Sequence, residues 1–123
     1  MADIKPSRPT VPGHSPAQVQ VYKWVLPAGG TDAGLPVTIP ISSDRSVDVY
    51  GSFAGGGTVV WEGGNDPDAP DYKTLNDSRG EGNPLSWTSA DIRQVLEVAT
   101  KMRPRKTAGS GEITVVLTAV SKG

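Results

Sequence analysis

The sequence predicts an all-β fold, an antiparallel β-sandwich or jelly roll of about eight short strands, for three reasons. First, the 123 residues include 15 glycines and 11 prolines, which disfavour helix interiors and favour turns. Second, valine and threonine are plentiful, and β-branched side chains fit a pleated surface. Third, several segments alternate apolar and polar residues, the pattern of strands with one buried face. The length corresponds to one domain.

The clearest alternating segments are residues 18–26 and 46–53. Residues 35–41 are also β-like, but Pro36 and Pro40 restrict them to a sheet edge or a bulge. Shorter expected strands, separated by glycine-rich or polar turns, occupy residues 58–62, 72–75, 85–88, 102–105 and 112–120.

Residues 89–100 fit two structures. Ile92, Val95, Leu96 and Ala99 have helical spacing, and Ser89 could cap a helix. The same stretch also fits a turn followed by a strand. We expect a short turn of helix near Asp91 and then a strand over residues 94–98.

Residues 1–17 are expected to form an extended arm that precedes a sandwich domain over residues 18–123. The arm has almost no apolar periodicity, and such a composition favours polyproline-like conformations. It is either a disordered tail or a segment that becomes ordered along a partner. It lacks the apolar stretch of a signal peptide, so we expect synthesis in the cytoplasm. Its prolines are Pro6, Pro9, Pro12 and Pro16.

The sequence offers no set of catalytic residues, no cofactor loop and no metal site, so we expect a protein that is not an enzyme. The chain has no cysteine, which excludes disulfides, thiolate zinc sites and cysteine catalysis. The single histidine, His14, lies in the arm and cannot build a zinc site alone. The glycines at 55–57 lie between two expected strands, which indicates a hairpin turn and not a phosphate-binding loop.

Acidic residues are concentrated between residues 62 and 82. Asp66, Asp68 and Asp77 have the spacing of positions 1, 3 and 12 of a calcium loop. However, Pro70 occupies position 5, and Asp71 stands where that loop requires glycine. A solvated acidic loop is therefore favoured over a looser calcium site. The carboxylates of this region are Glu62, Asp66, Asp68, Asp71, Asp77 and Glu81.

Lys101, Arg103, Arg105 and Lys106 form a basic segment without an intervening acid. It is either a solvated strand face or a contact with an acidic partner surface, such as the 62–82 loops of another copy. Nucleic acid is disfavoured because no aromatic residue interleaves with the cations and the net charge is -1. The same net charge gives no indication of an anionic membrane as a partner.

The three tryptophans, Trp24, Trp61 and Trp87, are expected in the core or at an interface. A chain of this size needs them there more than as exposed platforms for sugar binding.

Five stretches of the sequence resemble decoration, or cement, proteins that clamp the outside of the heads of podovirus-type tailed bacteriophages. They are residues 49–56, 60–66, 72–77, 83–88 and 102–104, with the sequences VYGSFAGG, VWEGGND, YKTLND, NPLSWT and MRP. The resemblance covers roughly residues 45–120. The chain departs from the family pattern at residues 67–71, an insertion, and at Tyr72, where the family has Trp.

The resemblance implies a virion structural protein that binds the capsid exterior across neighbouring major capsid subunits and stabilises the shell. A two-fold homodimer is expected in preference to a trimer. The alternatives are another virion component of the tail or neck, or a carbohydrate-binding β-sandwich module. The residues expected to contact the capsid or another partner are Pro6, Arg8, Pro9 and Pro12 of the arm, and Lys101, Arg103, Arg105 and Lys106 of the basic segment.

Overall fold

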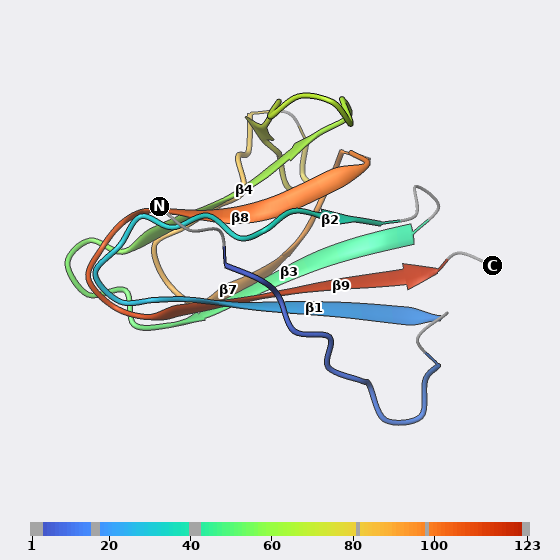
Figure 1. The fold of residues 1–123 in the computed structure, drawn as a ribbon, viewed down its shortest axis with the longest axis horizontal. Helices are drawn as coiled ribbons and strands as arrows, with labels where there is room; N and C mark the ends of the chain where they lie inside the picture. The colour runs from blue at the N-terminus through green and yellow to red at the C-terminus, as the bar shows by residue number, and fades with distance from the viewer. Residues whose placement is uncertain (1–3, 16–17, 40–42, 81, 98, 122–123) are drawn as a thin grey trace.

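In the computed structural model, the described residues form nine strands in two antiparallel sheets that pack face to face as a β-sandwich (Figure 1). The structure describes residues 4–15, 18–39, 43–80, 82–97 and 99–121. The first sheet has the order β1 (Val19–Leu26), β9 (Ile113–Ser121), β3 (Ser43–Gly51) and β7 (Asp91–Gln94). The second sheet has the order β2 (Val37–Thr38), β8 (Lys101–Ala108), β4 (Thr58–Gly64) and β5 (Lys73–Thr74), and β6 (Ser86–Trp87) also pairs with β4.

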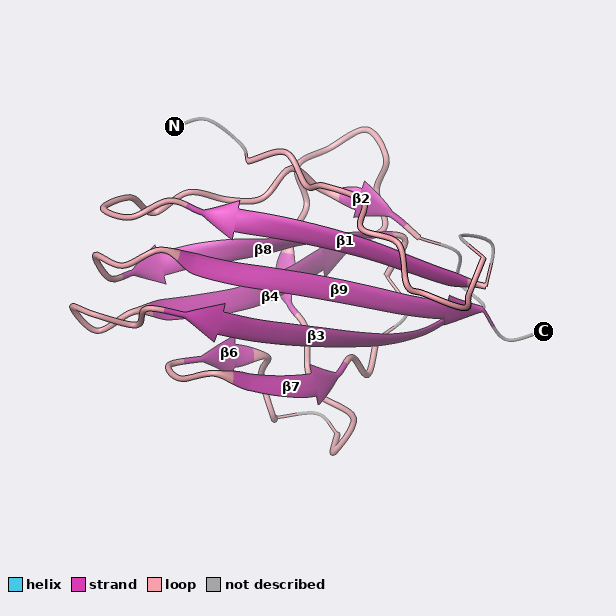
Figure 2. Cartoon of the chain, turned by 90° about the horizontal axis from the view of Figure 1, so that it is seen from below, coloured by secondary structure: helices cyan, strands magenta, loops and turns pink. Residues whose placement is uncertain are grey.

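The predicted all-β class and most of the predicted strands are confirmed. The segments predicted at 18–26, 46–53, 58–62, 102–105 and 112–120 correspond to the five long strands β1, β3, β4, β8 and β9. Of the segment predicted at 35–41, the described residues 35–39 contain the two-residue strand β2 at the edge of its sheet, the position that Pro36 predicts. Figure 2 shows the strands of the first sheet side by side, with β9 between β1 and β3.

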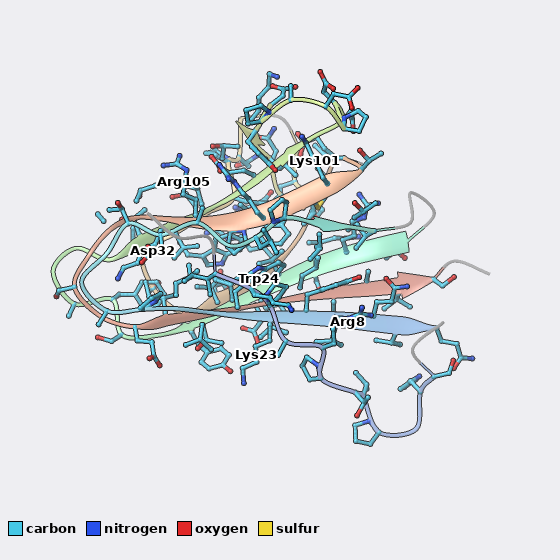
Figure 3. All side chains as sticks on the ribbon, in the orientation of Figure 1. Arg8, Lys23, Trp24, Asp32, Lys101 and Arg105 are labelled. Atoms are coloured by element: carbon cyan, nitrogen blue, oxygen red, sulfur yellow. The ribbon has the colours of Figure 1, made fainter. Side chains whose placement is uncertain are left out.

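The core lies between the sheets and is built by the inward side chains of the alternating strands. Trp24 of β1 and Trp61 of β4 are fully buried and meet edge to face, with ring centroids 5.7 Å apart. Trp87 of β6 is 1% exposed. The tryptophans are therefore core residues, as expected from the small size of the chain, and Figure 3 shows Trp24 between the two layers.

The helical turn predicted near Asp91 is wrong. Residues 91–94 form β7, which pairs with β3 through Val49 and Asp91 at one end. Val95 is buried as expected, whereas Ile92 is 61% exposed and Leu96 40% exposed. Pairing with the edge of β3 satisfies the backbone of this segment, and this tertiary contact overrides the weak helical pattern.

Two connections join the edges of the two sheets. On one side, Ile4 bridges to Gly34 and Ser7 bridges to Lys23 of β1, so the N-terminal segment spans both layers (Figure 1). On the other side, Asp77 bridges to Val95. Residues 4–8 thus belong to the folded body, in contrast to the free arm that the prolines suggested.

The described part of the chain contains no helix long and apolar enough to cross a membrane. Three residues named in the sequence predictions lie outside the described residues: Pro16, Pro40 and Glu81. Residue 98, at the end of the strand expected over 94–98, also lies outside them.

Candidate partner-binding surface

The basic segment of the sequence forms the first part of β8, where side chains alternate between two faces. Lys101, Arg103 and Arg105 lie on the outer face of the second sheet, and each is partly exposed (Figure 3). Lys106 points the other way, on the same side as Met102, and both are 0% exposed. The predicted surface of four cations is therefore a row of three, which we call the cation row. Lys106 cannot contact a partner from the core.

Lys106 instead connects two loops from inside the sandwich. Its Nζ donates hydrogen bonds to the carbonyl oxygens of Pro27, at 3.1 Å, and Gly111, at 2.7 Å. The first carbonyl follows β1 and the second precedes β9. The buried cation thus links the residue after β1 to the loop before β9, at one end of this strand pair. The dipoles of the two peptide carbonyls stabilise its charge.

The cation row carries its own counter-ion. Glu62 of β4 lies between Arg103 and Arg105, whose Nε atoms donate to its two carboxylate oxygens at 3.1 and 3.0 Å. Glu62 is only 5% exposed, whereas the Arg105 side chain is 41% exposed. The sequence predicted Glu62 at the end of a strand and also counted it among the acidic residues of 62–82; it lies within β4 and pairs with cations of the same chain.

An aromatic ring completes the cluster. The guanidinium carbon of Arg103 lies 3.8 Å from the ring centroid of Tyr72, and Lys101 Nζ lies 4.8 Å from the same centroid. Lys101 also donates to the carbonyl oxygen of Ala69. The loop after β4 therefore folds back onto β8. One carboxylate against three cations leaves the cluster positive, and the ring fixes the orientation of two of them.

The remaining acidic residues do not form a calcium loop. The Asp66 carboxylate accepts the backbone N–H of Asp68, and Asp71 pairs with Lys73 at 2.7 Å. Asp77 is buried and directed to Arg79, which donates to both of its oxygens. Among the residues that the structure describes, no group of three acidic or histidine side chains is placed to hold a metal ion.

Arg79 and Lys73 change the acidity of their partners. The hydrogen bonds from Arg79 hold the pKa of Asp77 below its ordinary value and raise the pKa of Arg79 itself. The hydrogen bond from Lys73 likewise lowers the pKa of Asp71. Both carboxylates are therefore ionised at neutral pH, as acceptors for neighbouring cations and not as proton donors.

The structure places the four predicted contact residues of the arm along the edge of β1. Pro6 is partly exposed, whereas Arg8, Pro9 and Pro12 are exposed. The Arg8 guanidinium carbon lies 4.2 Å from the ring centroid of Tyr22, and its Nε donates to the carbonyl oxygen of Val21. The arm and the cation row are on different sheets, so the structure does not bring the two predicted groups together.

Arg45 is a buried charge that the sequence analysis missed. It is 3% exposed, on the inward face of β3, and its Nη1 donates to the carbonyl oxygen of Ala99. Burial lowers the pKa of its guanidinium. The alternating pattern of the strand could have revealed this burial. Arg45 is two residues before Val47 and four before Val49, so its side chain lies on the same, buried face.

The burial of the tryptophans also bears on sugar binding. None of the three can serve as an exposed stacking platform, and of the other aromatic residues Tyr50 is 41% exposed. No family model matches the chain, and no curated protein matches it.

Proposed function

We propose that this protein is a non-enzymatic virion structural protein that binds the outside of a tailed-phage capsid, across neighbouring major capsid subunits, and stabilises the shell. In this proposal its place is the exterior of the virion. It works by mass action, because a protein that binds only the assembled shell stabilises that shell.

One observation carries the proposal. Two of the stretches that resemble decoration proteins, residues 60–66 and 102–104, are far apart in sequence, yet they meet in the cluster on the outer face of the second sheet. Glu62 comes from the first and Arg103 from the second, and the two side chains form an ion pair; Tyr72, where the chain departs from the family pattern, packs against Arg103. Part of the resemblance thus falls on this surface cluster and not only on residues of the core.

The strand order supports the same proposal. Apart from β5 and β6, which both pair with β4, the strands alternate between the sheets in chain order, with β1, β3, β7 and β9 in one and β2, β4 and β8 in the other. Such alternation is typical of a jelly roll, and we propose that the sandwich belongs to that class. Jelly rolls are frequent in viral capsid proteins and in lectins. A shared fold does not by itself define a function, so the proposed binding to a capsid depends on the surface cluster.

The cluster is suited to a protein partner with exposed carboxylates. Arg105 is its most exposed guanidinium, and guanidinium groups bind carboxylates in a bidentate manner. Because Glu62 and Tyr72 already orient the neighbouring cations, less side-chain entropy is lost on binding. Many copies around the symmetry axes of a shell would multiply a modest contact.

The test is binding to expanded, empty heads assembled from the major capsid protein of the same virus. We expect the protein to co-sediment with the heads, to raise their melting temperature and to appear as regular density on their outer surface. Arg105→Glu should reduce co-sedimentation about tenfold, as expected for loss of a charged contact. Lys73→Glu, with the same charge change at a 76% exposed side chain outside the cluster, should bind as the wild type does.

Absence of binding to heads, or binding without a rise in melting temperature, would overturn the proposal. Density on a tail or neck, with none on the head, would favour the alternative virion component. Binding to a glycan array with no binding to heads would favour the carbohydrate-binding module.

A further inference from the structure

We propose that the outer face of the first sheet is the interface of a two-fold homodimer in which the β9 strands of the two copies lie against each other. This face consists of the outward side chains of β1, β9, β3 and β7. The inference concerns a different sheet from the cation row, and it does not depend on the proposed function.

The face is large, pleated and poor in charge. Its most exposed apolar side chains are Ile92, 61% exposed, Val120, 44%, Val25, 42%, and Tyr50, 41%. Its other residues include Thr114, Val116 and Thr118 along β9. Val25 and Tyr50 flank Thr114 in one row of the sheet, Ile92 lies in the row of Val116, and Val120 lies at the opposite end. The outer face of the second sheet, in contrast, carries the cation row.

Lys23 and Asp48 have a symmetrical arrangement in the middle of this face, and a third charge, Asp44, lies on the same face opposite Val120. Lys23 of β1 pairs in register with Val116 of β9, and Val116 pairs with Asp48 of β3. Lys23 and Asp48 therefore flank the central strand, about 10 Å apart at the usual spacing of two strands. Neither makes an ion pair with any other residue that the structure describes. Figure 3 shows Lys23 directed away from the second sheet.

This arrangement is complementary to itself about one axis. Consider a two-fold axis that lies in the plane between the two copies and runs parallel to β9. Rotation by 180° about this axis places Lys23 over Asp48 of the second copy and Asp48 over Lys23 of the second copy. It also places Val116 against Val116 and Val25 against Tyr50. A two-fold axis perpendicular to the strands, through this row of residues, would instead place Lys23 over Lys23 and Asp48 over Asp48. Such contacts between like charges are unfavourable. The charge pattern thus selects a second copy as the occupant and fixes its orientation.

The shape of this face, with a projecting loop on one side and a groove on the other, is consistent with the same axis. Residues 9–15 project beside the start of β1, as Figure 1 shows, and a cavity of about 110 Å³ separates their loop from Val19 and Val21. At the same end of the sheet, on the side of β3, lies a groove of about 220 Å³ lined by Ser46, Gln94 and Thr118, among others. Rotation about β9 carries the projecting loop of one copy toward the groove of the other.

The size of the face sets the expected affinity. Three to four strands of about eight residues give a patch of roughly 400–500 Å² on each copy, from the standard strand spacing and rise. The total of about 1,000 Å² is near the lower limit of specific interfaces. We therefore expect a reversible dimer with a dissociation constant on the order of micromolar.

The first test is sedimentation velocity of the full chain at increasing concentration, up to about 500 µM. Lys23→Glu and Asp48→Lys should each raise the dissociation constant about tenfold or more. The double variant Lys23→Glu/Asp48→Lys should restore it to within about threefold of the wild type. Lys73→Glu is the matched control and should leave the dimer unchanged. Far-UV circular dichroism checks that each variant is folded.

The second test locates the axis. Because the chain has no cysteine, Val116→Cys and Val25→Cys each introduce a single thiol. Stacked sheets lie about 10 Å apart, too far for a direct disulfide, so a short bis-maleimide is the probe. With the axis along β9, the Val116→Cys thiols face each other and should cross-link at least about fivefold faster than those of Val25→Cys, which face Tyr50.

Three outcomes would overturn the inference. They are a wild-type chain that stays monomeric at the highest concentration, a double variant that dimerises no better than the single variants, and faster cross-linking at residue 25 than at residue 116.

Discussion

Glu62 on β4 and Arg103 on β8 lie directly opposite each other in the second sheet, joined by a 3.1 Å hydrogen bond between Oε1 and Nε. Removal of the carboxylate charge should therefore destabilise the protein. We expect Glu62→Gln, which keeps the volume of the side chain, to lower the free energy of unfolding by about 1–3 kcal/mol, the range for hydrogen bonds to charged groups. Urea denaturation followed by tryptophan fluorescence measures it.

The matched control is Asp71→Asn, which removes a carboxylate from an exposed pair with Lys73. An exposed ion pair contributes little, so the loss should stay below about 0.5 kcal/mol. Equal losses in the two variants would contradict a special role for the buried carboxylate.

Lys106 provides a prediction about chemical reactivity. Because this side chain is fully buried and donates to the carbonyls of Pro27 and Gly111, an amine-reactive reagent should leave it unmodified in the native protein. Lys73, whose side chain is 76% exposed, should react readily. Mass spectrometry after brief labelling distinguishes the two sites, and rapid modification of Lys106 would show that the burial is wrong.

The same residue can be tested by substitution. Lys106→Met keeps the length of the side chain but leaves the two carbonyls without their donor. We expect the free energy of unfolding to fall by about 1–3 kcal/mol, the cost of buried unsatisfied polar groups. A variant as stable as the wild type would mean that Lys106 contributes no net stability at this site.

The interaction of Asp77 with Arg79 should make the stability of the protein depend on pH. Its pKa is lower in the folded protein than in the unfolded chain, because Arg79 hydrogen-bonds to the carboxylate. The folded state therefore binds the proton less tightly, and the stability that the pair confers is present above the unfolded pKa of about 4. This stability is lost as the pH falls through the lowered pKa of the folded state.

The corresponding measurement is thermal unfolding between pH 6 and about pH 2, where ordinary carboxylates also titrate. Asp77→Asn should be less stable than the wild type at neutral pH, and the difference should shrink toward acid. The exposed Asp68 supplies the control, since Asp68→Asn should run parallel to the wild type. A constant difference between Asp77→Asn and the wild type would contradict the assignment.

Gly34 should not tolerate a side chain. A Cβ at this position would lie 2.6 Å from Cδ1 of Trp24 and 2.7 Å from Cδ of Pro104. Gly34→Ala should therefore lower the free energy of unfolding by about 1–3 kcal/mol, as overpacking of a core does. Gly30→Ala, whose Cβ would meet only the flexible carboxylate of Asp32, should cost much less. Calorimetry of both variants makes the comparison, and similar melting points would contradict it.

The sequence was sufficient for local structure and insufficient for contacts between distant residues. Alternation located β1, β3, β4 and β9, because one face of each is buried and the period is two. The same parity rule, applied to β8 and β3, would have placed Lys106 and Arg45 inside. The contact between Glu62 and Arg103 depends on which strands become neighbours, which no local pattern specifies.

The N-terminal segment illustrates a second limit. Its prolines predicted an extended segment, but composition says nothing about where such a segment lies. Ile4 and Ser7 find backbone partners on Gly34 and Lys23 and so join the body, whereas the loop that follows them projects. The helix expected near Asp91 failed for a related reason, because the open edge of β3 was not visible from the sequence.

The position of β9 in the first sheet has a consequence for how the protein folds. β1 and β3 do not pair with each other, because each pairs with β9, which follows both in the sequence. Val19 meets Val120, and Ser43 meets Ser121, so nearly the whole chain must be gathered before either ladder can close. Contacts between residues so far apart slow folding, because the loop-closure entropy is lost before the ladder stabilises the structure. We therefore expect the first sheet to close late in folding, and a chain cut before β9 would leave β1 and β3 without the neighbour they share.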